Sequence, residues 1–223
     1  MEFNPGPCYS NPTSMQAKVY LVGDSHAAQW IPGIESANSS DSLNFRFLTK
    51  SGCPFVHLNL DPSCERWIEE VLRDINRFKP ERIIISNLTN GQYLNFYSPG
   101  DYAKFWLSRF SSLLKRIPSK SQILLIEDTP YSSFDTSECL LSRNQNDCRF
   151  QFRASPLTTQ IRNFAIRNKI AYISFKDRLC PTSSCLSGDS LINYYRDENH
   201  ISVSASKRFG PELISQIKRT IPN

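Results

Sequence analysis

Four consecutive residues, Gly23-Asp24-Ser25-His26, carry the sharpest chemical signal in this sequence. Gly23 closes a short apolar run, so Ser25 stands where a strand is expected to give way to a helix. A serine at a helix N-terminus lies among free backbone N–H groups that favour developing negative charge, and its hydroxyl could attack a carbonyl carbon if a base lay near. The structural alternative is that Ser25 only caps the helix, because serine is a favoured N-cap residue.

A second candidate site lies near the C-terminus, where Asp197 and His200 are three residues apart. This spacing lets both side chains lie on one side of a helical turn. The carboxylate can then hold one imidazole nitrogen while the other nitrogen acts as a base. The structural alternative is a solvated loop before the last helix. A chain that also offers a strand-end serine favours the chemical interpretation.

The elements that must position these residues alternate along the chain. Short apolar runs predict strands at 18–23, 44–49, 82–86, 122–126 and 170–174, and amphipathic stretches predict helices at 26–36, 65–78, 101–116, 156–168 and 203–219. This alternation implies crossover connections and a parallel five-stranded sheet with helices on both faces, a three-layer α/β/α sandwich. Ligands bind at the carboxyl ends of such strands, where Ser25 is expected. We expect residues 1–16 to be an extended lead-in and residues 17–223 to be one domain.

Composition limits the function classes. The chain has 223 residues, 39% of them hydrophobic, which is enough for one sizeable core. Its 26 Lys and Arg against 21 Asp and Glu give a net charge of +5, but the basic residues are scattered rather than clustered, which argues against nucleic acid as a partner. This charge is compatible with a mild attraction to an anionic glycan or membrane surface. No apolar run approaches the ~20 residues of a membrane-spanning helix, and no signal peptide precedes residue 17, so we expect a soluble domain.

Six of the seven cysteines form three pairs that are close in sequence and separated by loop-type residues: Cys53 with Cys64, Cys139 with Cys148, and Cys180 with Cys185. Neither a Cys-x-x-Cys motif nor zinc-finger histidine spacing is present, so we expect no metal site. Three short disulfide-bridged loops in an oxidising compartment are the simplest interpretation. Reduced thiols in a cytosolic protein are the alternative. Cys8 is left over.

Taken together, these motifs resemble the SGNH (GDSL-like) esterase and acyltransferase superfamily, and more narrowly the SGNH domain fused to acyltransferase-3 membrane proteins, which O-acetylate bacterial surface polysaccharides. The likeness runs from about residue 8 to the end of the chain. It rests on the motifs Val22-Gly23-Asp24-Ser25-His26-Ala27, Gly52-Cys53-Pro54, Asp128-Thr129-Pro130 with Cys139-Leu140, Leu179-Cys180-Pro181 with Cys185, and Tyr195-Arg196-Asp197-x-x-His200-x-Ser202. It implies the flavodoxin-like sheet of SGNH hydrolases.

The resemblance also assigns roles. Ser25 matches the family's nucleophile, and Asp197 and His200 match the acid and base of its triad. Gly52 matches the glycine whose backbone N–H joins that of Ser25 in the oxyanion hole, and Asn87 matches the oxyanion asparagine. The asparagine match departs from the family pattern, because Gly-x-Asn-Asp is absent here. The structural alternatives are turn residues at Gly52 and Asn87.

The mechanism implied by the resemblance is acetyl transfer through an acetyl-serine. His200 takes the proton of Ser25 as its hydroxyl attacks an acetyl carbonyl, and the oxyanion donors stabilise the intermediate by roughly 3 kcal/mol each. A sugar hydroxyl then collects the acetyl group. The chemistry needs no metal or bound cofactor. In the family, acetyl-CoA is the ultimate donor and is used by the membrane domain.

The same resemblance predicts the partners and the location. We expect a polysaccharide acceptor such as O-antigen, an N-terminal acyltransferase-3 membrane domain in the full-length protein, a location on the periplasmic or other extracytoplasmic side of a bacterial inner membrane, and a monomer for the isolated domain. Exposed aromatic side chains near the strand ends are candidates for an acceptor groove, with ordinary packing as the alternative: Tyr93, Phe96, Tyr97, Tyr194 and Tyr195. A carbohydrate acetylesterase with the same triad, or a non-catalytic glycan-binding domain, are the competing functions.

Overall fold

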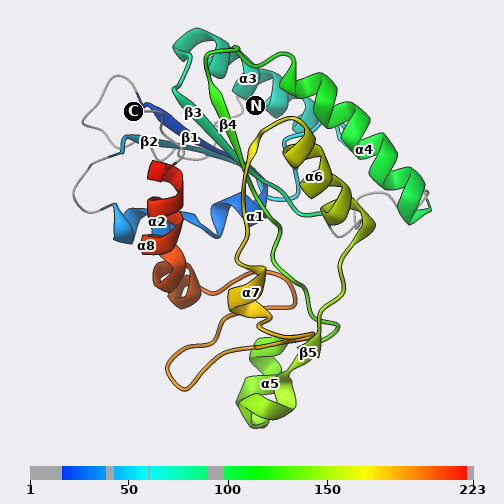
Figure 1. The fold of residues 1–223 in the computed structure, drawn as a ribbon, viewed down its shortest axis with the longest axis vertical. Helices are drawn as coiled ribbons and strands as arrows, with labels where there is room; N and C mark the ends of the chain where they lie inside the picture. Colours follow the sequence, from blue (N-terminus) through cyan, green and yellow to red (C-terminus); the bar gives the residue numbers. More distant parts are fainter. Residues whose placement is uncertain (1–16, 39–42, 60, 90–97, 220–223) are drawn as a thin grey trace.

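A five-stranded parallel sheet lies between two helical layers (Figure 1). The computed structural model describes residues 17–38, 43–59, 61–89 and 98–219. Within these ranges the strands follow the order β2-β1-β3-β4-β6. Their bounds are β1 (Val19–Gly23), β2 (Phe45–Thr49), β3 (Arg82–Ser86), β4 (Gln122–Ile126) and β6 (Ala171–Ile173). The predicted three-layer α/β/α fold with five parallel strands is confirmed.

The strand order creates a crevice at the edge where the functional residues were predicted. The chain leaves β1 toward β2 and then returns to place β3 on the other side of β1, so the direction of winding reverses between β1 and β3. Ligands bind outside the carboxyl ends of strands at such a point. Gly23 is level with both Thr49 and Ser86 in the register. The residues after β1, β2 and β3 therefore emerge at one edge of the sheet.

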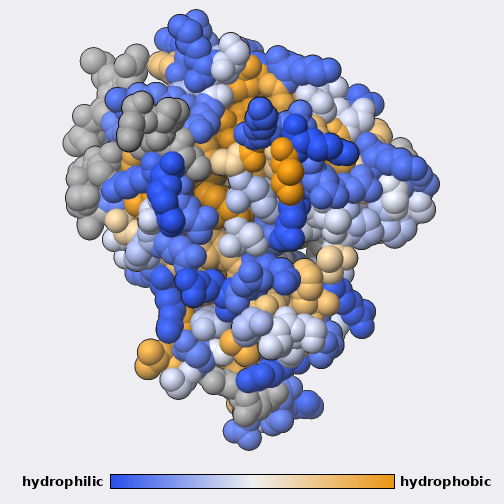
Figure 2. All heavy atoms as spheres, in the orientation of Figure 1, coloured by the Kyte–Doolittle hydropathy of each residue, from blue (hydrophilic) through white to orange (hydrophobic). Residues whose placement is uncertain are grey.

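Successive side chains of β1 point to opposite faces of the sheet and pack into two separate hydrophobic cores. Val19 and Leu21 pack toward the layer of α1 (Ser25–Ala28), α2 (Ile31–Ala37) and α8 (Val203–Arg219). Tyr20 and Val22 pack toward the layer of α3 (Pro62–Phe78), α4 (Pro99–Leu114) and α6 (Pro156–Arg167). Each of these β1 side chains is at most 1% exposed, and the surface in the same view is mainly hydrophilic (Figure 2). The sheet is thus covered on both faces.

Three long helices begin with an Asp-Pro or Ser-Pro pair. Asp61, Ser98 and Ser155 cap α3, α4 and α6, and a proline follows each cap. Proline suits the first turn because its missing N–H would have no partner there. These caps start α3 and α4 earlier than the predicted residues 65 and 101. No helix of the described ranges has the length and apolar character to cross a lipid bilayer.

The predicted helix at 26–36 is wrong in one respect, because the segment forms two helices. α1 ends at Ala28, and α2 begins at Ile31 with Pro32 in its first turn. Proline has no N–H to donate to the carbonyl group of residue 28, so one continuous helix is broken at this point. The break ends α1 after Ala28, and α2 packs along α8.

A small lobe extends beyond the carboxyl ends of the strands (Figure 1). It contains α5 (Thr136–Ser142), a 3₁₀ helix η1 (Gln145–Cys148), α7 (Lys176–Leu179) and the antiparallel pair β5 (Phe150–Gln151) and β7 (Ser184–Cys185). The sequence indicated only a polar segment here. Disulfides join Cys139 to Cys148 and Cys180 to Cys185, and a third joins Cys53 to Cys64, as predicted. Cys8 and the predicted lead-in at 1–16 lie outside the described residues.

Candidate active site

Ser25, His200 and Asp197 form one hydrogen-bonded chain at the carboxyl edge of the sheet. The Oγ atom of Ser25 lies 2.8 Å from Nε2 of His200, and Nδ1 of His200 lies 2.8 Å from Oδ2 of Asp197. Asp24, not Ser25, is the N-cap of α1, because its carboxylate accepts a hydrogen bond from the His26 N–H at 2.8 Å. The structural alternative for Ser25 is therefore wrong, and its hydroxyl faces the imidazole.

The segment that carries the acid and the base is a loop rather than the predicted helical turn. Oδ1 of Asp197 accepts hydrogen bonds from the backbone N–H groups of Asn199 at 2.9 Å and His200 at 2.7 Å. This Asx-type turn folds the chain back so that the carboxylate lies beside its own imidazole partner. α8 begins only at Val203.

Three contacts fix this loop against other elements. The side-chain oxygen of Gln29, just after α1, accepts a hydrogen bond from Ile201 N–H at 2.8 Å. The hydroxyl of Thr129 donates to the Asn199 carbonyl at 2.7 Å, and that of Thr136 donates to the Asp197 carbonyl at 2.9 Å. These bonds connect the loop to α1 and to the chain after β4. They explain how residues 175 positions apart come into contact.

The electrostatics of the loop suit a base at neutral pH. Burial raises the pKa of Asp197, but the hydrogen bonds from the backbone of His200 and Asn199 outweigh this effect, so that the net pKa is lowered and the carboxylate stays ionised. Burial, and then the neighbouring His26, lower the pKa of His200 despite the opposing effect of Asp197. His200 is therefore neutral at pH 7 and can accept a proton.

His26 and Asp128 form a buried pair behind this chain that the sequence analysis did not assign a role. The side chains are 0% and 5% exposed, and Nδ1 of His26 lies 2.6 Å from Oδ1 of Asp128. The other carboxylate oxygen accepts from both the N–H and the hydroxyl of Thr89, at 2.7 and 3.0 Å. Asp128 comes two residues after the end of β4. This position at the strand-end edge is the one sequence feature that could have predicted its place in the site.

Two buried carboxylates surround His26. Asp24 is buried, and its second oxygen accepts a hydrogen bond from Leu88 N–H at 2.9 Å. Burial raises the pKa of Asp24. Burial alone would lower the pKa of His26, but Asp128, with Asp24 and Asp197, outweighs it and raises that pKa. The protonated form of His26 is thus favoured, and its ring lies next to the imidazole of His200.

Gly52 and Asn87 flank the same edge. Lys50 N–H donates to the Gly23 carbonyl at 3.1 Å, and Phe55 N–H donates to Oδ1 of Asn87 at 2.8 Å, so the loop after β2 spans the ends of β1 and β3. The second bond fixes which way the amide of Asn87 points. Gly52 has φ +73°, and no atom lies within 4 Å of the position that a Cβ would take. Among the described residues, no group accepts a hydrogen bond from the N–H groups of Ser25 and Gly52.

Gly23 is required by close packing. A Cβ at this residue would lie 1.8 Å from the Ser86 carbonyl oxygen, and its φ of +151° is a conformation that glycine favours. The chain can therefore turn from β1 into α1 directly against the end of β3. This contact sets where Asp24 and Ser25 leave the sheet.

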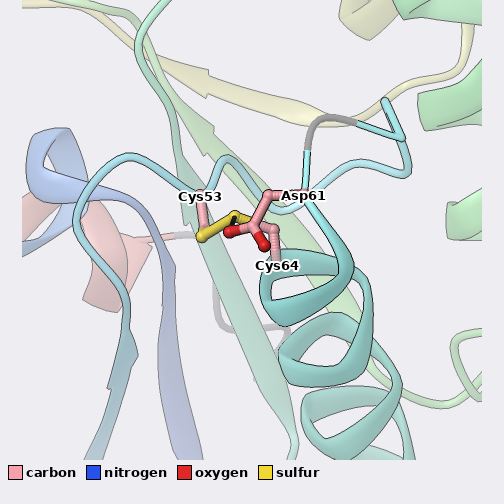
Figure 3. Close-up of side chains that lie close together, drawn as sticks. All are labelled: Cys53, Asp61 and Cys64. Atoms are coloured by element: carbon pink, nitrogen blue, oxygen red, sulfur yellow. Dashed lines mark hydrogen bonds between the residues drawn. A yellow bond between two sulfur atoms is a disulfide. The ribbon is translucent and has the colours of Figure 1, made fainter.

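Cys53, Asp61 and Cys64 lie close together at the start of α3 (Figure 3). The two sulfur atoms are joined in a disulfide, so neither is available as a thiolate ligand for a metal ion. The bridge instead ties the residue after Gly52 to the first turn of α3. It holds the loop that presents the Gly52 N–H.

Two of the aromatic residues predicted for an acceptor groove are buried. Tyr194 and Tyr195 are 8% and 1% exposed and pack in the core beside α8. Their prediction as exposed groove residues is wrong, because the loop that carries Asp197 folds inward at this point. Tyr93, Phe96 and Tyr97 lie outside the described residues.

Comparison with solved structures defines the class of the fold. The periplasmic domain of a lipopolysaccharide acetyltransferase from Salmonella ser. Paratyphi A is 17% identical, with a TM-score of 0.69 over 89% of this chain and 84% of that one. A GDSL-like lipase from Bacteroides thetaiotaomicron is 13% identical, with a TM-score of 0.58 over 91% and 88%. An inhibitor-bound aryl esterase from M. smegmatis is 13% identical, with a TM-score of 0.57 over 92% and 100%. At these identities the likeness shows the fold, which is that of SGNH hydrolases.

The family follows from the sequence. The model of the SGNH domain (fused to AT3 domains) matches residues 2–215. The chain belongs to this family, as its motifs predicted. No curated protein sequence is significantly similar to the chain.

Proposed function

We propose that this chain is the extracytoplasmic acyl-transfer domain of a bacterial O-acetyltransferase, with Ser25 as nucleophile, His200 as base and Asp197 as the acid that orients the base. The observation that carries the proposal is the Ser25–His200–Asp197 chain, with Nε2 of His200 2.8 Å from the serine oxygen. It lies in a member of the SGNH family fused to AT3 domains. Nucleophile, base and orienting carboxylate are the parts that acyl transfer to and from serine requires.

In the first half-reaction His200 removes the proton of Ser25 through Nε2 while Oγ attacks an acetyl carbonyl carbon. Asp197 holds the proton on Nδ1, which leaves Nε2 as the acceptor. The lowered pKa of His200 supports this role, because the imidazole is neutral before the attack. The donor's leaving group takes the proton back from His200, and acetyl-Ser25 remains.

The tetrahedral intermediate needs donors for its oxyanion. We assign this role to the backbone N–H groups of Ser25 and Gly52 and to the side-chain amide of Asn87. The bond from Phe55 N–H to Oδ1 of Asn87 supports the assignment. It occupies the amide oxygen and leaves the Nδ2 group of Asn87 as the donor for the oxyanion. A donor of this kind typically contributes about 2.7–4 kcal/mol to the transition state.

In the second half-reaction a hydroxyl group of a cell-surface polysaccharide gives its proton to His200 and attacks acetyl-Ser25. The acetylated glycan leaves, and the serine is restored. The fusion recorded in the family name supports an AT3 membrane domain as the partner that brings the acetyl group, with acetyl-CoA as its ultimate source. We propose no bound cofactor or metal in this domain. The Salmonella domain is a periplasmic domain, which supports an extracytoplasmic location here.

Covalent labelling of Ser25 tests the proposal directly. A fluorophosphonate should add once to the chain, as seen in the intact mass, and peptide mapping should place it on Ser25. Ser25→Ala should remove the label, and His200→Ala should slow labelling strongly, because nucleophile and base act as a unit. Ser98→Ala is the matched control: it removes the cap of α4, at a cost of ~1 kcal/mol, and leaves labelling intact. An unlabelled, folded wild-type chain would contradict the assignment.

A further inference from the structure

A groove of about 250 Å³ lies on the small lobe beside the candidate active site. Its lining combines aromatic, basic and amide side chains: Tyr131, Phe134, Phe150, Arg149, Arg153 and Gln151. The surface of the lobe in Figure 2 shows hydrophilic residues around a few apolar ones. The volume approaches the ~300–1,000 Å³ of typical small-molecule sites. One or a few sugar rings are the size of ligand that such a groove suits.

The groove is fixed relative to the loop that carries His200. Ser132 N–H donates to the Glu198 carbonyl at 2.7 Å, next to Tyr131 in the groove wall. Phe150 packs edge-on against Tyr195, with ring centroids 5.5 Å apart. The groove wall and the loop that carries His200 are therefore in direct contact.

A second, much smaller cavity of about 20 Å³ lies between the groove and the sheet. It shares Tyr131 and Arg153 with the groove and is also lined by Thr89 and Asp128. Asp128 pairs with His26 behind the Ser25–His200 contact, and Thr89 donates a hydrogen bond to Asp128. The lining is thus continuous from the lobe to the strand-end edge.

The charge of the groove is positive. Arg149 and Arg153 are exposed, and no carboxylate of the described residues pairs with either guanidinium group. Two acidic residues that line the neighbouring cavity pair elsewhere: Glu127 with Arg162 at 2.7 Å, and Asp128 with His26. Oδ1 of Asp135 accepts two backbone N–H groups at the start of α5. Two unpaired guanidinium groups beside aromatic rings fit a planar anionic group on a ring-shaped ligand.

We propose that this groove binds an acidic segment of the acceptor glycan, through carboxylate or phosphate groups on its sugars, and so selects anionic polysaccharides. This inference rests on the proposed function. Arg149 and Arg153 would pair with the anionic groups, while Tyr131 offers a partly exposed ring for the apolar face of a sugar, being 37% exposed. Positioning of the acceptor next to acetyl-Ser25 is what lets a sugar hydroxyl compete with water.

Calorimetric titration of the chain with defined oligosaccharides tests the groove. Tetragalacturonic acid is the carboxylate probe, a phosphomannan oligosaccharide is the phosphate probe, and maltotetraose is the neutral probe. We expect at least one acidic probe to bind, more weakly as salt rises, and the neutral probe to bind at least tenfold more weakly. The acidic probe that binds identifies the anionic group. Equal binding of acidic and neutral probes, or no binding of either acidic probe, would overturn the proposal.

Substitution localises the binding. Arg149→Gln with Arg153→Gln should weaken binding of the acidic probe by tenfold or more, because two charged hydrogen-bond donors are lost. Arg167→Gln, at the exposed end of α6, is the matched control and should change nothing. Unchanged binding in the double variant would refute this location. Fluorophosphonate labelling of Ser25 should be the same in all variants, so a chain that labels but does not bind acidic glycans fails only this inference.

Discussion

The imidazole rings of His26 and His200 lie with their centroids 4.6 Å apart and their planes inclined by 40°. His26 is fully buried and pairs with Asp128, while His200 reaches Ser25 and Asp197. The charged and titratable groups around the two rings are Asp24, Asp128, Asp197 and, at the surface, Arg196. A proton held on His26 repels a second proton on His200. We therefore expect His26 to influence His200 through its charge, although it does not touch Ser25.

This relationship predicts the effect of His26→Gln on pH dependence. Asp128 raises the pKa of His26 against the effect of burial, which favours the protonated form, and the charge of that form contributes to the lowered pKa of His200. Without it, His200 should hold its proton to higher pH. The acidic limb of Ser25 labelling by a fluorophosphonate should therefore move to higher pH.

His57→Gln is the matched control for that experiment. His57 pairs with Glu65 and Glu69 of α3 and contacts neither His26 nor His200. Its loss should leave the acidic limb where it is in the wild-type chain. A slower His26→Gln variant with an unmoved acidic limb would mean that His26 only supports the loop mechanically.

Regular strands and helices could be predicted from the sequence, whereas the geometry of the site could not. The strands at 82–86 and 122–126 and the last helix at 203–219 have the predicted bounds, because each is a continuous apolar run or a regular amphipathic face. The contact between Ser25 and His200 was predicted from the residue types and from the family resemblance. Its geometry depends on long-range bonds, such as that from Ile201 N–H to Gln29, which no local pattern encodes.

The small lobe was missed for a related reason. Its elements are short, and the polar stretch after β4 has no periodicity. Its order comes from the disulfides and from the packing of Phe150 on Tyr195, both of which need the folded chain. The same packing removed Tyr194 and Tyr195 from the surface, because apolar contact with α8 outweighs any exposure that their position suggested. Asp128 went unassigned because a single carboxylate after a strand is common.

Asn87 gives a prediction that separates oxyanion binding from loop support. Asn87→Asp keeps an oxygen that can accept from Phe55 N–H but replaces the amide donor with a carboxylate. We expect acetyl transfer to fall by about 10²–10³-fold. The free energy of unfolding should fall only by the cost of burying the new carboxylate, because its oxygen still accepts from Phe55 N–H. Asn87→Ala should lose activity and also some stability, because the buried Phe55 N–H then lacks its acceptor.

Steady-state rates and urea unfolding of the two Asn87 variants provide the measurement. Wild-type activity in Asn87→Asp would show that the side chain only holds the loop after β2. In that case the oxyanion would rely on the backbone N–H groups of Ser25 and Gly52.

The Cys53–Cys64 disulfide should affect both stability and chemistry. Replacing both cysteines with serine should lower the free energy of unfolding by about 2–3 kcal/mol on the chain-entropy model, since the closed loop is short. It should also slow the labelling of Ser25, because Gly52 precedes Cys53 and loses its tether to α3. Urea unfolding and labelling kinetics under non-reducing conditions measure the two effects.

Replacement of Cys139 and Cys148 by serine is the comparison for that experiment. This disulfide lies in the lobe at α5 and η1, away from the loop of Gly52. This replacement should lower the free energy of unfolding by a similar amount and leave the rate of Ser25 labelling close to that of the wild type. Equal labelling rates in the two double variants would show that the bridge at Cys53 does not position the Gly52 N–H.

The last prediction concerns what attacks acetyl-Ser25. Water is present at about 55 M and wins unless an acceptor hydroxyl is held in line, where effective molarities reach about 10⁵–10⁸ M. The chain by itself should therefore release acetate only slowly from small acetyl esters. Efficient transfer should require the AT3 membrane domain and a glycan, and acidic glycans should be the better acceptors if the groove at Arg149 and Arg153 is used.

Acetate release by the chain, measured beside glycan acetylation by the full-length protein, decides between transfer and hydrolysis. We expect transfer to exceed hydrolysis, and Ser25→Ala to abolish both. If the chain alone released acetate from acetylated sugars at tens of turnovers per second, a rate typical of dedicated enzymes near ~10 s⁻¹, the Ser25–His200–Asp197 chain would serve a carbohydrate acetylesterase. The acceptor would then be water, and acidic glycans would be substrates to be deacetylated rather than acceptors.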